Sequence, residues 1–179
     1  MDVRPYTDAD RDGLVALVQP VAELGGAVGF LEVPTADEVD EWRRGLHAEL
    51  LLAVEDSRLL ACGALKRPTN PVMRRMAEIT KVMTHPDARG RGAGRAVVTA
   101  LIELAREDGR ELLTLECRGN NHAAQQLYSS VGFVVTGRRP DAIAVGDDRF
   151  DQVLMHCDLR TGTAGLTRFG SRREGLGSG

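Results

Sequence analysis

Residues 82–95 read V-M-T-H-P-D-A-R-G-R-G-A-G-R, from Val82 to Arg95, and separate two segments with different patterns. The segment before them is apolar and β-branched around Ile79 and Thr80, which indicates a strand. The segment after them repeats apolar residues at the spacing of a helix, at Val97, Leu101, Leu104 and Ala105. The stretch therefore predicts a strand, a glycine-rich loop and the start of a helix.

The glycine-rich loop predicts an anion site at the start of this helix. Glycine lets the backbone approach a ligand closely, and the free amides of a helix N-terminus bind anions such as phosphate. A tight turn also needs glycine for steric reasons alone, so the loop by itself leaves both interpretations open. Its spacing matches neither the dinucleotide-binding fingerprint nor the P-loop. The residues of the loop are Arg89, Gly90, Arg91, Gly92, Ala93, Gly94 and Arg95.

Two motifs of the chain resemble the GNAT N-acetyltransferase superfamily. The loop matches its pyrophosphate-binding motif R/Q-x-x-G-x-G/A through Arg89, Gly92 and Gly94. The segment Leu113–Phe133 is similar to the fifth strand and fourth helix of the superfamily, and its matching residues are Asn121, Ala124, Leu127, Tyr128, Gly132 and Phe133. Within the superfamily, 25–30 and 77–84 most resemble tabtoxin-resistance acetyltransferases, whereas 113–133 is equally similar to ribosomal-protein alanine N-acetyltransferases.

The order of the predicted elements indicates the fold class. Strands and helices alternate, which predicts an α/β (α+β) three-layer sandwich on one mixed sheet. The resemblance implies a GNAT-like sheet of six to seven strands with about four helices. Residues 1–159 form the expected N-acetyltransferase domain, and the Gly- and Arg-rich residues 160–179 are expected to be a flexible tail. Pro20 should kink or end the first helix, and Arg138–Asp148 should be a loop between the last two strands.

The bulk composition narrows the class of protein. With 179 residues, 42% of them hydrophobic, the chain fits one globular domain. The net charge of −3 and the scattered arginines argue against nucleic acid as a partner. No apolar run reaches the ~18 residues of a membrane span and no signal peptide is visible, so we expect a cytoplasmic protein without membrane association. The spacing of the three cysteines and four histidines suggests reduced thiols and no metal site.

The resemblance implies that acetyl-CoA is the cosubstrate and assigns residues to it. The loop amides of 89–95 would hold its pyrophosphate, and the pantetheine would enter a gap between two strands, 82–84 and 113–116. Backbone amides near Val82, Met83 and Thr84 would bind the pantetheine and an oxyanion. Asn121 would bind the pantetheine arm, although its place before a helix is equally typical of a cap.

Three side chains are candidates for the chemistry of acetyl transfer to an amine. An alkylammonium has a pKa near 10, so a base must remove its proton at neutral pH. Glu116 is the first candidate base and Glu78 the second; either could instead pair with an arginine such as Arg118 or Arg74. The resemblance implies that Tyr128 returns a proton to the thiolate; alternatively, it is a core tyrosine. A phenol is a weaker acid than a thiol by about 1.5 pKa units, so transfer of its proton to the thiolate is unfavourable. As the donor, Tyr128 would therefore need a lowered phenol pKa or a concerted transfer.

These expectations combine into one leading function and two alternatives. The leading hypothesis is an acetyl-CoA-dependent N-acetyltransferase for the primary amine of a small molecule, with antibiotics and toxins among the candidates. The alternatives are acetylation of a protein N-terminus and a non-catalytic acyl-CoA sensor. The loops Gly25–Pro34 and Arg138–Asp148 are expected to shape the acceptor site, and the acids Asp37, Asp40 and Glu41 to form either a solvated helix face or an acidic lip. Homodimer formation is left open.

Overall fold

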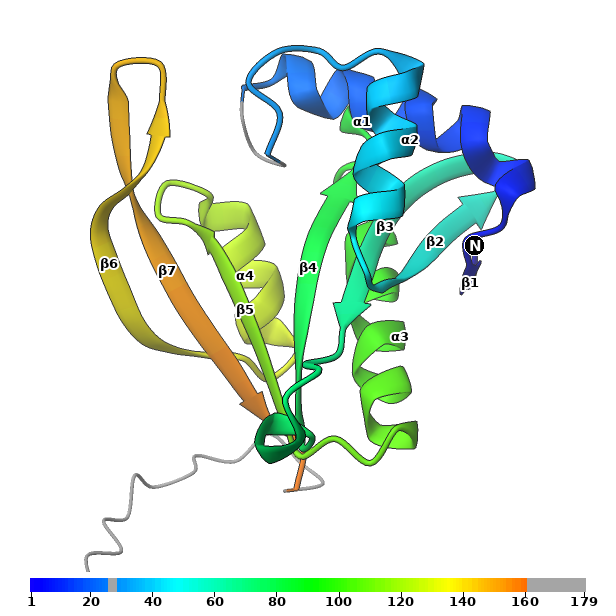
Figure 1. The fold of residues 1–179 in the computed structure, drawn as a ribbon. Helices are drawn as coiled ribbons and strands as arrows, with labels where there is room; N and C mark the ends of the chain where they lie inside the picture. Colours follow the sequence, from blue (N-terminus) through cyan, green and yellow to red (C-terminus); the bar gives the residue numbers. More distant parts are fainter. Residues whose placement is uncertain (26–28, 161–179) are drawn as a thin grey trace, which may run out of the picture.

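The protein is built on one mixed sheet of seven strands in the order β1-β2-β3-β4-β5-β7-β6 (Figure 1). The computed structural model describes residues 1–25 and 29–160, so the expected tail and part of the 25–30 stretch lie outside the described residues. Neighbouring strands are antiparallel except β4 and β5, which run parallel. The strands are β1 (Asp2–Pro5), β2 (Glu49–Glu55), β3 (Arg58–Lys66), β4 (Met76–Thr84), β5 (Leu112–Arg118), β6 (Val134–Val145) and β7 (Asp148–Asp158).

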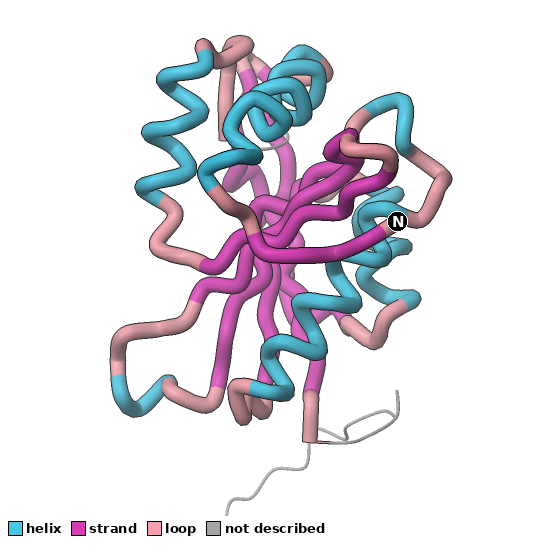
Figure 2. Tube along the Cα trace, turned by 90° about the vertical axis from the view of Figure 1, so that its right-hand side faces the viewer, coloured by secondary structure: helices cyan, strands magenta, loops and turns pink. Residues whose placement is uncertain are grey.

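Helices cover both faces of the sheet, which Figure 2 shows from the side. The α-helices are α1 (Arg11–Glu23), α2 (Ala36–Gly45), α3 (Ala93–Glu107) and α4 (His122–Ser130). Three single-turn 3₁₀ segments complete the described elements: η1 (Asp8–Asp10), η2 (Pro71–Met73) and η3 (Pro86–Ala88). The three-layer sandwich with a seven-stranded sheet and four α-helices confirms the predicted fold class. In the described part of the chain, no helix is long and apolar enough to cross a bilayer.

Two apolar cores lie on the two faces of the sheet. On one face, α3 buries Val97, Leu101 and Ala105 completely, at the helical spacing seen in the sequence. On the other face, α1 buries Leu17 and Val18 against β2 and β3. Each core therefore fixes one helix layer, and the strand ends between the layers remain available for a site.

Strands β4 and β5 diverge after a short paired segment. Their register is limited to Met76↔Leu112, Ala77↔Leu113 and Glu78↔Thr114. Farther along β4, Lys81 has a φ of 56°, and the register against β3 shifts between Cys62 and Ala64. Such a bulge adds twist to the strand and turns it away from its neighbour. The two facing strand edges therefore open into a wedge, visible in Figure 1.

The prediction that Arg138–Asp148 forms a loop is wrong, because this segment belongs to a long hairpin. Strand β6 continues to Val145 and turns into β7 at Asp148, with pairs such as Ile143↔Phe150 near the tip. Pro140 cannot donate to the ladder, and Asp141 has a φ of 52°, so the register shifts between Arg139 and Ile143. The irregular residues thus interrupt the pairing without ending the strand.

Helix α1 does not end at Pro20 as the sequence allowed. It continues to Glu23, and Val21 and Ala22 after the proline are buried. Proline costs the helix a hydrogen bond, but the apolar face continues into the core on both sides of it. The helix stops before Gly25, whose φ is 88°.

A buried carboxylate near the N-terminus gives a stability prediction. Asp10 is 8% exposed and accepts two hydrogen bonds from Arg4, at 2.6 and 2.8 Å, and two from Thr7. These contacts hold the pKa of Asp10 well below its usual value. Asp10→Asn should lower the free energy of unfolding at pH 7 by about 1–2 kcal/mol in urea titrations.

The pH dependence of this effect follows from the lowered pKa. A carboxyl whose folded pKa is lower than its unfolded value, near 3.9, stabilises the protein above that value and loses the contribution as pH falls further. The difference between wild type and Asp10→Asn should therefore shrink below about pH 4. Asp12→Asn is the control, because Asp12 is 94% exposed, and it should change stability by less than about 0.5 kcal/mol. A loss of equal size from both variants would contradict the role of Asp10.

Candidate active site

Two adjoining cavities occupy the wedge between β4 and β5. The larger, of about 740 Å³, lies over the glycine-rich loop and α4; we call it the loop cavity. The smaller, of about 350 Å³, reaches from the wedge to the β6–β7 hairpin; we call it the hairpin cavity. Val82, Asn121 and Tyr128 line both. The two cavities therefore meet at these three residues.

The glycine-rich loop has the geometry expected of an anion site. Gly90 and Gly92 have φ values of 74° and 84°, in the left-handed region that favours glycine, and Gly92 caps α3. A Cβ on Gly94 would lie 2.7 Å from Thr84 Oγ1, so α3 packs closely against β4 at this glycine, and a larger residue would displace the Thr84 side chain. The first amides of α3 have no acceptor within the helix, and the loop lines the loop cavity. Backbone donors thus gather at one end of this cavity.

The arginines of the loop separate into two groups. Arg89 and Arg95 line the loop cavity. Arg91 instead pairs with Glu55 at the end of β2 and does not line it. The structure therefore brings only two of the three predicted loop arginines to this site.

The three predicted β4 residues all line the loop cavity, but they do so differently. The Met83 side chain is 2% exposed in the core beneath α1, and its strand partner is Cys62. Val82 packs against the opposite core and also lines the hairpin cavity. Met83 therefore has only its backbone to offer a ligand, as the amide assignment requires.

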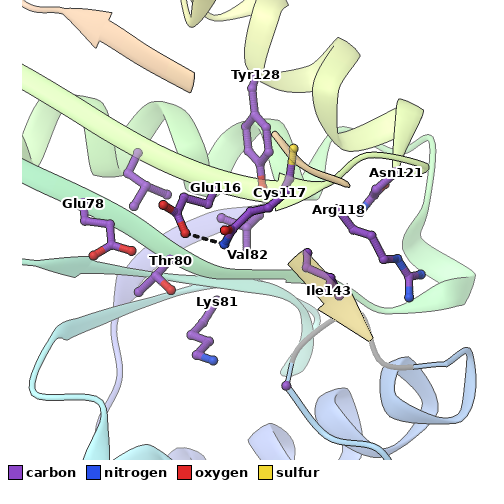
Figure 3. Close-up of a pocket in the computed structure, with 13 residues that line it drawn as sticks. Glu78, Thr80, Lys81, Val82, Glu116, Cys117, Arg118, Asn121, Tyr128 and Ile143 are labelled. Carbon is purple, nitrogen blue, oxygen red and sulfur yellow. Dashed lines mark hydrogen bonds between the residues drawn. The ribbon is translucent and has the colours of Figure 1, made fainter. Parts of the chain in front are cut away.

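Tyr128 stands where the two cavities meet. Its side chain is 6% exposed, packs against Phe133 with ring centroids 6.1 Å apart, and belongs to the α3-side core. Figure 3 shows its ring descending from α4 with the hydroxyl end toward Glu116 and Val82. The ring is therefore core, as one interpretation predicted, and the hydroxyl end faces the site, while its part in proton transfer stays a prediction.

The phenol pKa of Tyr128 is raised, whereas one option from the sequence was a lowered pKa. Burial raises the pKa of its phenol, and the neighbouring Cys117 raises it further. A lowered phenol pKa is therefore wrong for this structure, because desolvation disfavours the phenolate. The phenol keeps its proton at neutral pH, which leaves concerted transfer as the way for Tyr128 to act as a donor.

Asn121 forms the cap that its position predicted. Its Oδ1 accepts a hydrogen bond from the amide of Ala124 at 3.2 Å, at the start of α4. The cap uses the side-chain oxygen, and Asn121 also lines both cavities. Capping fixes the side chain next to the meeting point of the cavities.

Glu78 and Glu116 both line the hairpin cavity. Glu116 accepts hydrogen bonds from Arg139 at 2.9 Å and from Gln152 at 2.5 Å, the contact dashed in Figure 3. Glu116 is therefore paired with an arginine, as the alternative interpretation expected, but the partner is Arg139 of the hairpin instead of Arg118 or Arg74. The Glu78 side chain makes no hydrogen bond or ion pair with any other described residue. One carboxylate is held in place and the other is free to meet a ligand.

Several residues of the hairpin cavity were not predicted as site residues. Lys81, Ile143 and Gln152 line it, as does Arg118, which the sequence suggested only as an ion-pair partner. The available signal was the alternation in 152–157, where buried Val153 assigns Gln152 to the opposite face. Ile143, in contrast, lay in the expected loop over 138–148, so no strand alternation was available for it.

The acids on α2 do not form a lip on the site. Arg11 pairs with Asp40 at 2.6 Å and with Asp37 at 3.4 Å, and neither acid lines the hairpin cavity. They are a charged helix face tied to α1. No cluster of three or more potential metal ligands occurs in residues 1–25 and 29–160, and the expectation of a metal-free site stays a prediction.

Known proteins resemble this chain in sequence and in fold. The chain is 39% identical over 59 residues to the L-amino acid N-acyltransferase MnaT of Escherichia coli K12, covering 33% of this chain and 34% of the relative. It is 34% identical over 79 residues to the ribosomal protein bS18-alanine N-acetyltransferase of the same strain, covering 44% and 53%. The chain thus spans about a third to a half of the length of these curated relatives.

Solved structures extend the similarity over most of the chain. The yncA protein of Salmonella typhimurium, solved with acetyl-CoA, superposes with a TM-score of 0.75 at 22% identity, covering 88% of this chain and 93% of that one. At this identity the likeness shows the fold. The model of the acetyltransferase (GNAT) family matches residues 20–133, which contain both motifs. The predicted resemblance is confirmed, and the chain belongs to the acetyltransferase (GNAT) family.

Proposed function

We propose that the chain is an acetyl-CoA-dependent N-acetyltransferase that acetylates the primary amine of a small molecule. The observation that supports this most directly is the meeting of two cavities at Val82, Asn121 and Tyr128. A two-substrate transfer needs one cavity for the donor and one for the acceptor, with the reacting atoms at the junction. The loop cavity suits the donor because of its backbone donors, and the hairpin cavity suits the acceptor.

The residues of the loop cavity fit coenzyme A. The amides at the start of α3, with Arg89 and Arg95 beside them, suit the pyrophosphate. The β4 edge beyond Glu78 has no strand partner on the β5 side, so its amides and carbonyls can pair with the amide groups of the pantetheine arm. When bound, acetyl-CoA supplies the activated acetyl thioester.

The side chains at the junction divide the proton transfers between them. Glu116 takes the proton of the acceptor ammonium, directly or through a water, so that the amine can attack the thioester carbonyl. Backbone amides near Val82–Thr84 stabilise the oxyanion as the carbonyl becomes tetrahedral. Tyr128 donates its proton as the sulfur leaves. Because burial raises the phenol pKa, this proton moves in concert with the departure of the sulfur.

The size of the hairpin cavity favours a small acceptor over a protein chain. About 350 Å³ lies at the lower end of the range for small-molecule sites. Walls come from β4, β5 and the β6–β7 hairpin, and Gly29 lies at the edge. Antibiotic and toxin amines belong to the acceptor class that fits. The second candidate is the N-terminus of a protein, since a bS18-alanine acetyltransferase is among the relatives.

Thiol release from acetyl-CoA tests the proposed function. A panel of small primary amines should release free thiol in proportion to acetylated product, and a peptide with an N-terminal alanine should react more slowly. Preference for the peptide would favour the second candidate. Calorimetric binding of CoA without turnover of any amine in a broad panel would identify a sensor in place of an enzyme.

A glycine substitution tests the assignment of the loop cavity. Gly92→Val should raise the dissociation constant of CoA at least tenfold, or about 1.4 kcal/mol, because a side chain would push the loop away from the phosphates. Gly109→Val is a matched control, since Gly109 has a φ of 69° at the other end of α3 and open space around it. Both variants strain a left-handed glycine, but only Gly92→Val should weaken binding in calorimetry. Unchanged affinity in a folded Gly92→Val would contradict the assignment.

A further inference from the structure

The charged residues of the hairpin cavity are ordered along its two parallel strands. On β4 the acid Glu78 precedes the cation Lys81, and on β5 the acid Glu116 precedes the cation Arg118. Because β4 and β5 run in the same direction, both acids lie toward the paired end of the wedge and both cations toward its open end. Two residues of a strand span roughly 7 Å. The cavity therefore has an acidic end and a cationic end a short distance apart.

At the acidic end, one negative charge is already compensated. Glu116 pairs with Arg139 at 2.9 Å, whereas Glu78 has no charged partner among the described residues. Glu78 is thus the group that a substrate ammonium would meet first, while Glu116 is held near the hydroxyl end of Tyr128 (Figure 3). This end can accommodate a single ammonium group.

At the cationic end, Arg118 is fixed in place by contacts with two other walls. Its Nη1 donates to the carbonyl of Gly25 at 3.2 Å, and its guanidinium lies 4.9 Å from the ring centroid of Phe150. Its Nε is buried and has no hydrogen-bond partner in the described structure. A guanidinium offers five donors in a rigid planar arrangement that matches a carboxylate. Arg118 is therefore a preorganised cation with donors left for an anion.

We propose that the acceptor is a zwitterion, a free α-amino acid or a close analogue, whose ammonium group lies at Glu78 and Glu116 and whose acid group lies at Arg118. This inference rests on the proposed acetyltransferase function. A purely cationic acceptor such as a polyamine would place its second charge beside Arg118 and Lys81, which repel it. A peptide N-terminus has no carboxylate next to its amine and would bring no anion to the guanidinium of Arg118. Only a small molecule with both charges satisfies both ends.

The test compares amino acids with their own amides as acceptors of the wild-type protein. Each pair has the same side chain and differs in the acid group. The α-amine of an amino acid amide is less basic than that of the amino acid, so a larger fraction of it is unprotonated at neutral pH. The intrinsic reactivity of the amine would therefore favour the amide. We expect kcat/KM for leucine, methionine and phenylalanine to exceed that of the corresponding amide at least tenfold, mainly through KM. Amides that react as well as the acids, or better, would overturn the proposal.

Variants of Arg118 assign the preference to its charge. Arg118→Gln should lower kcat/KM for the acids at least tenfold and leave that for the amides within about twofold, whereas Arg118→Lys should restore part of the preference. Arg44→Gln, on the exposed surface of α2, is the control and should leave both unchanged. Equal losses for acids and amides in Arg118→Gln would mean that Arg118 only supports the cavity wall, and would overturn its role.

The outcome also separates this inference from the proposed function. If amides or polyamines are acetylated and amino acids are not, only the zwitterion inference fails. If CoA binds and no amine of any class releases thiol, the acetyltransferase function itself fails. The wild-type comparison needs no variant, so a misfolded Arg118 variant would not prevent the test.

Discussion

Glu116→Gln is expected to lower kcat about 10²- to 10⁴-fold, the usual cost of losing a general base. Glutamine keeps the shape of the side chain and a hydrogen bond with Gln152, but it cannot take the ammonium proton. The affinity for CoA should stay at the wild-type value in calorimetry, because Glu116 lines the hairpin cavity and not the loop cavity. Steady-state thiol release at saturating acetyl-CoA measures the effect.

Glu78→Gln is the matched variant on the neighbouring strand. It removes the same charge from the same cavity, but Glu78 is the carboxylate that we expect to hold the ammonium before reaction. Its loss should raise KM for the amine and change kcat much less. Should Glu78→Gln abolish turnover while Glu116→Gln keeps most of it, the base is Glu78.

Tyr128→Phe should also lower kcat about 10²- to 10⁴-fold, since the departing thiolate would lose its proton donor. The stability cost should be small, because the Tyr128 hydroxyl makes no hydrogen bond with the described residues while the ring supplies the packing against Phe133. A large loss of rate with an unchanged urea midpoint and unchanged CoA affinity is the expected combination.

Tyr6→Phe provides the control for this substitution. Tyr6 is the other of the two tyrosines, and its ring lies beneath the guanidinium of Arg43, away from both cavities. Removing its hydroxyl should leave kcat unchanged. If Tyr128→Phe behaves in the same way, Tyr128 is a core residue without a part in proton transfer.

The elements that the sequence predicted well are those set by local chemistry. The glycine-rich loop needed left-handed residues, and Gly90 and Gly92 provide them. The buried stripe of α3 follows from helical spacing, and the cap at Asn121 from its position before α4. These features depend on a few neighbouring residues, so they can be inferred without knowing the rest of the fold.

The features that the sequence did not predict depend on contacts between distant segments. Pro140 and the polar residues around it are typical of a loop, yet pairing with β7 on both sides of them keeps the segment in one strand. The partners of Glu116 are 23 and 36 residues away in sequence and became visible only through this hairpin. The raised pKa of the Tyr128 phenol likewise depends on how deeply α4 packs against the sheet.

The two cavities are built from parts of the protein with very different roles in its stability. Ala88, Ala93 and Tyr128 of the loop cavity belong to the main apolar core, whereas Ile143 and Gln152, the hairpin residues that line the hairpin cavity, belong to neither core. Substitutions that remove packing in the first group disturb folding, whereas a substitution of Ile143 can change what the acceptor touches without disturbing either core. Natural selection can therefore alter the accepted amine through the hairpin while the cofactor side is inherited unchanged, so one scaffold can supply acetyltransferases for many different amines.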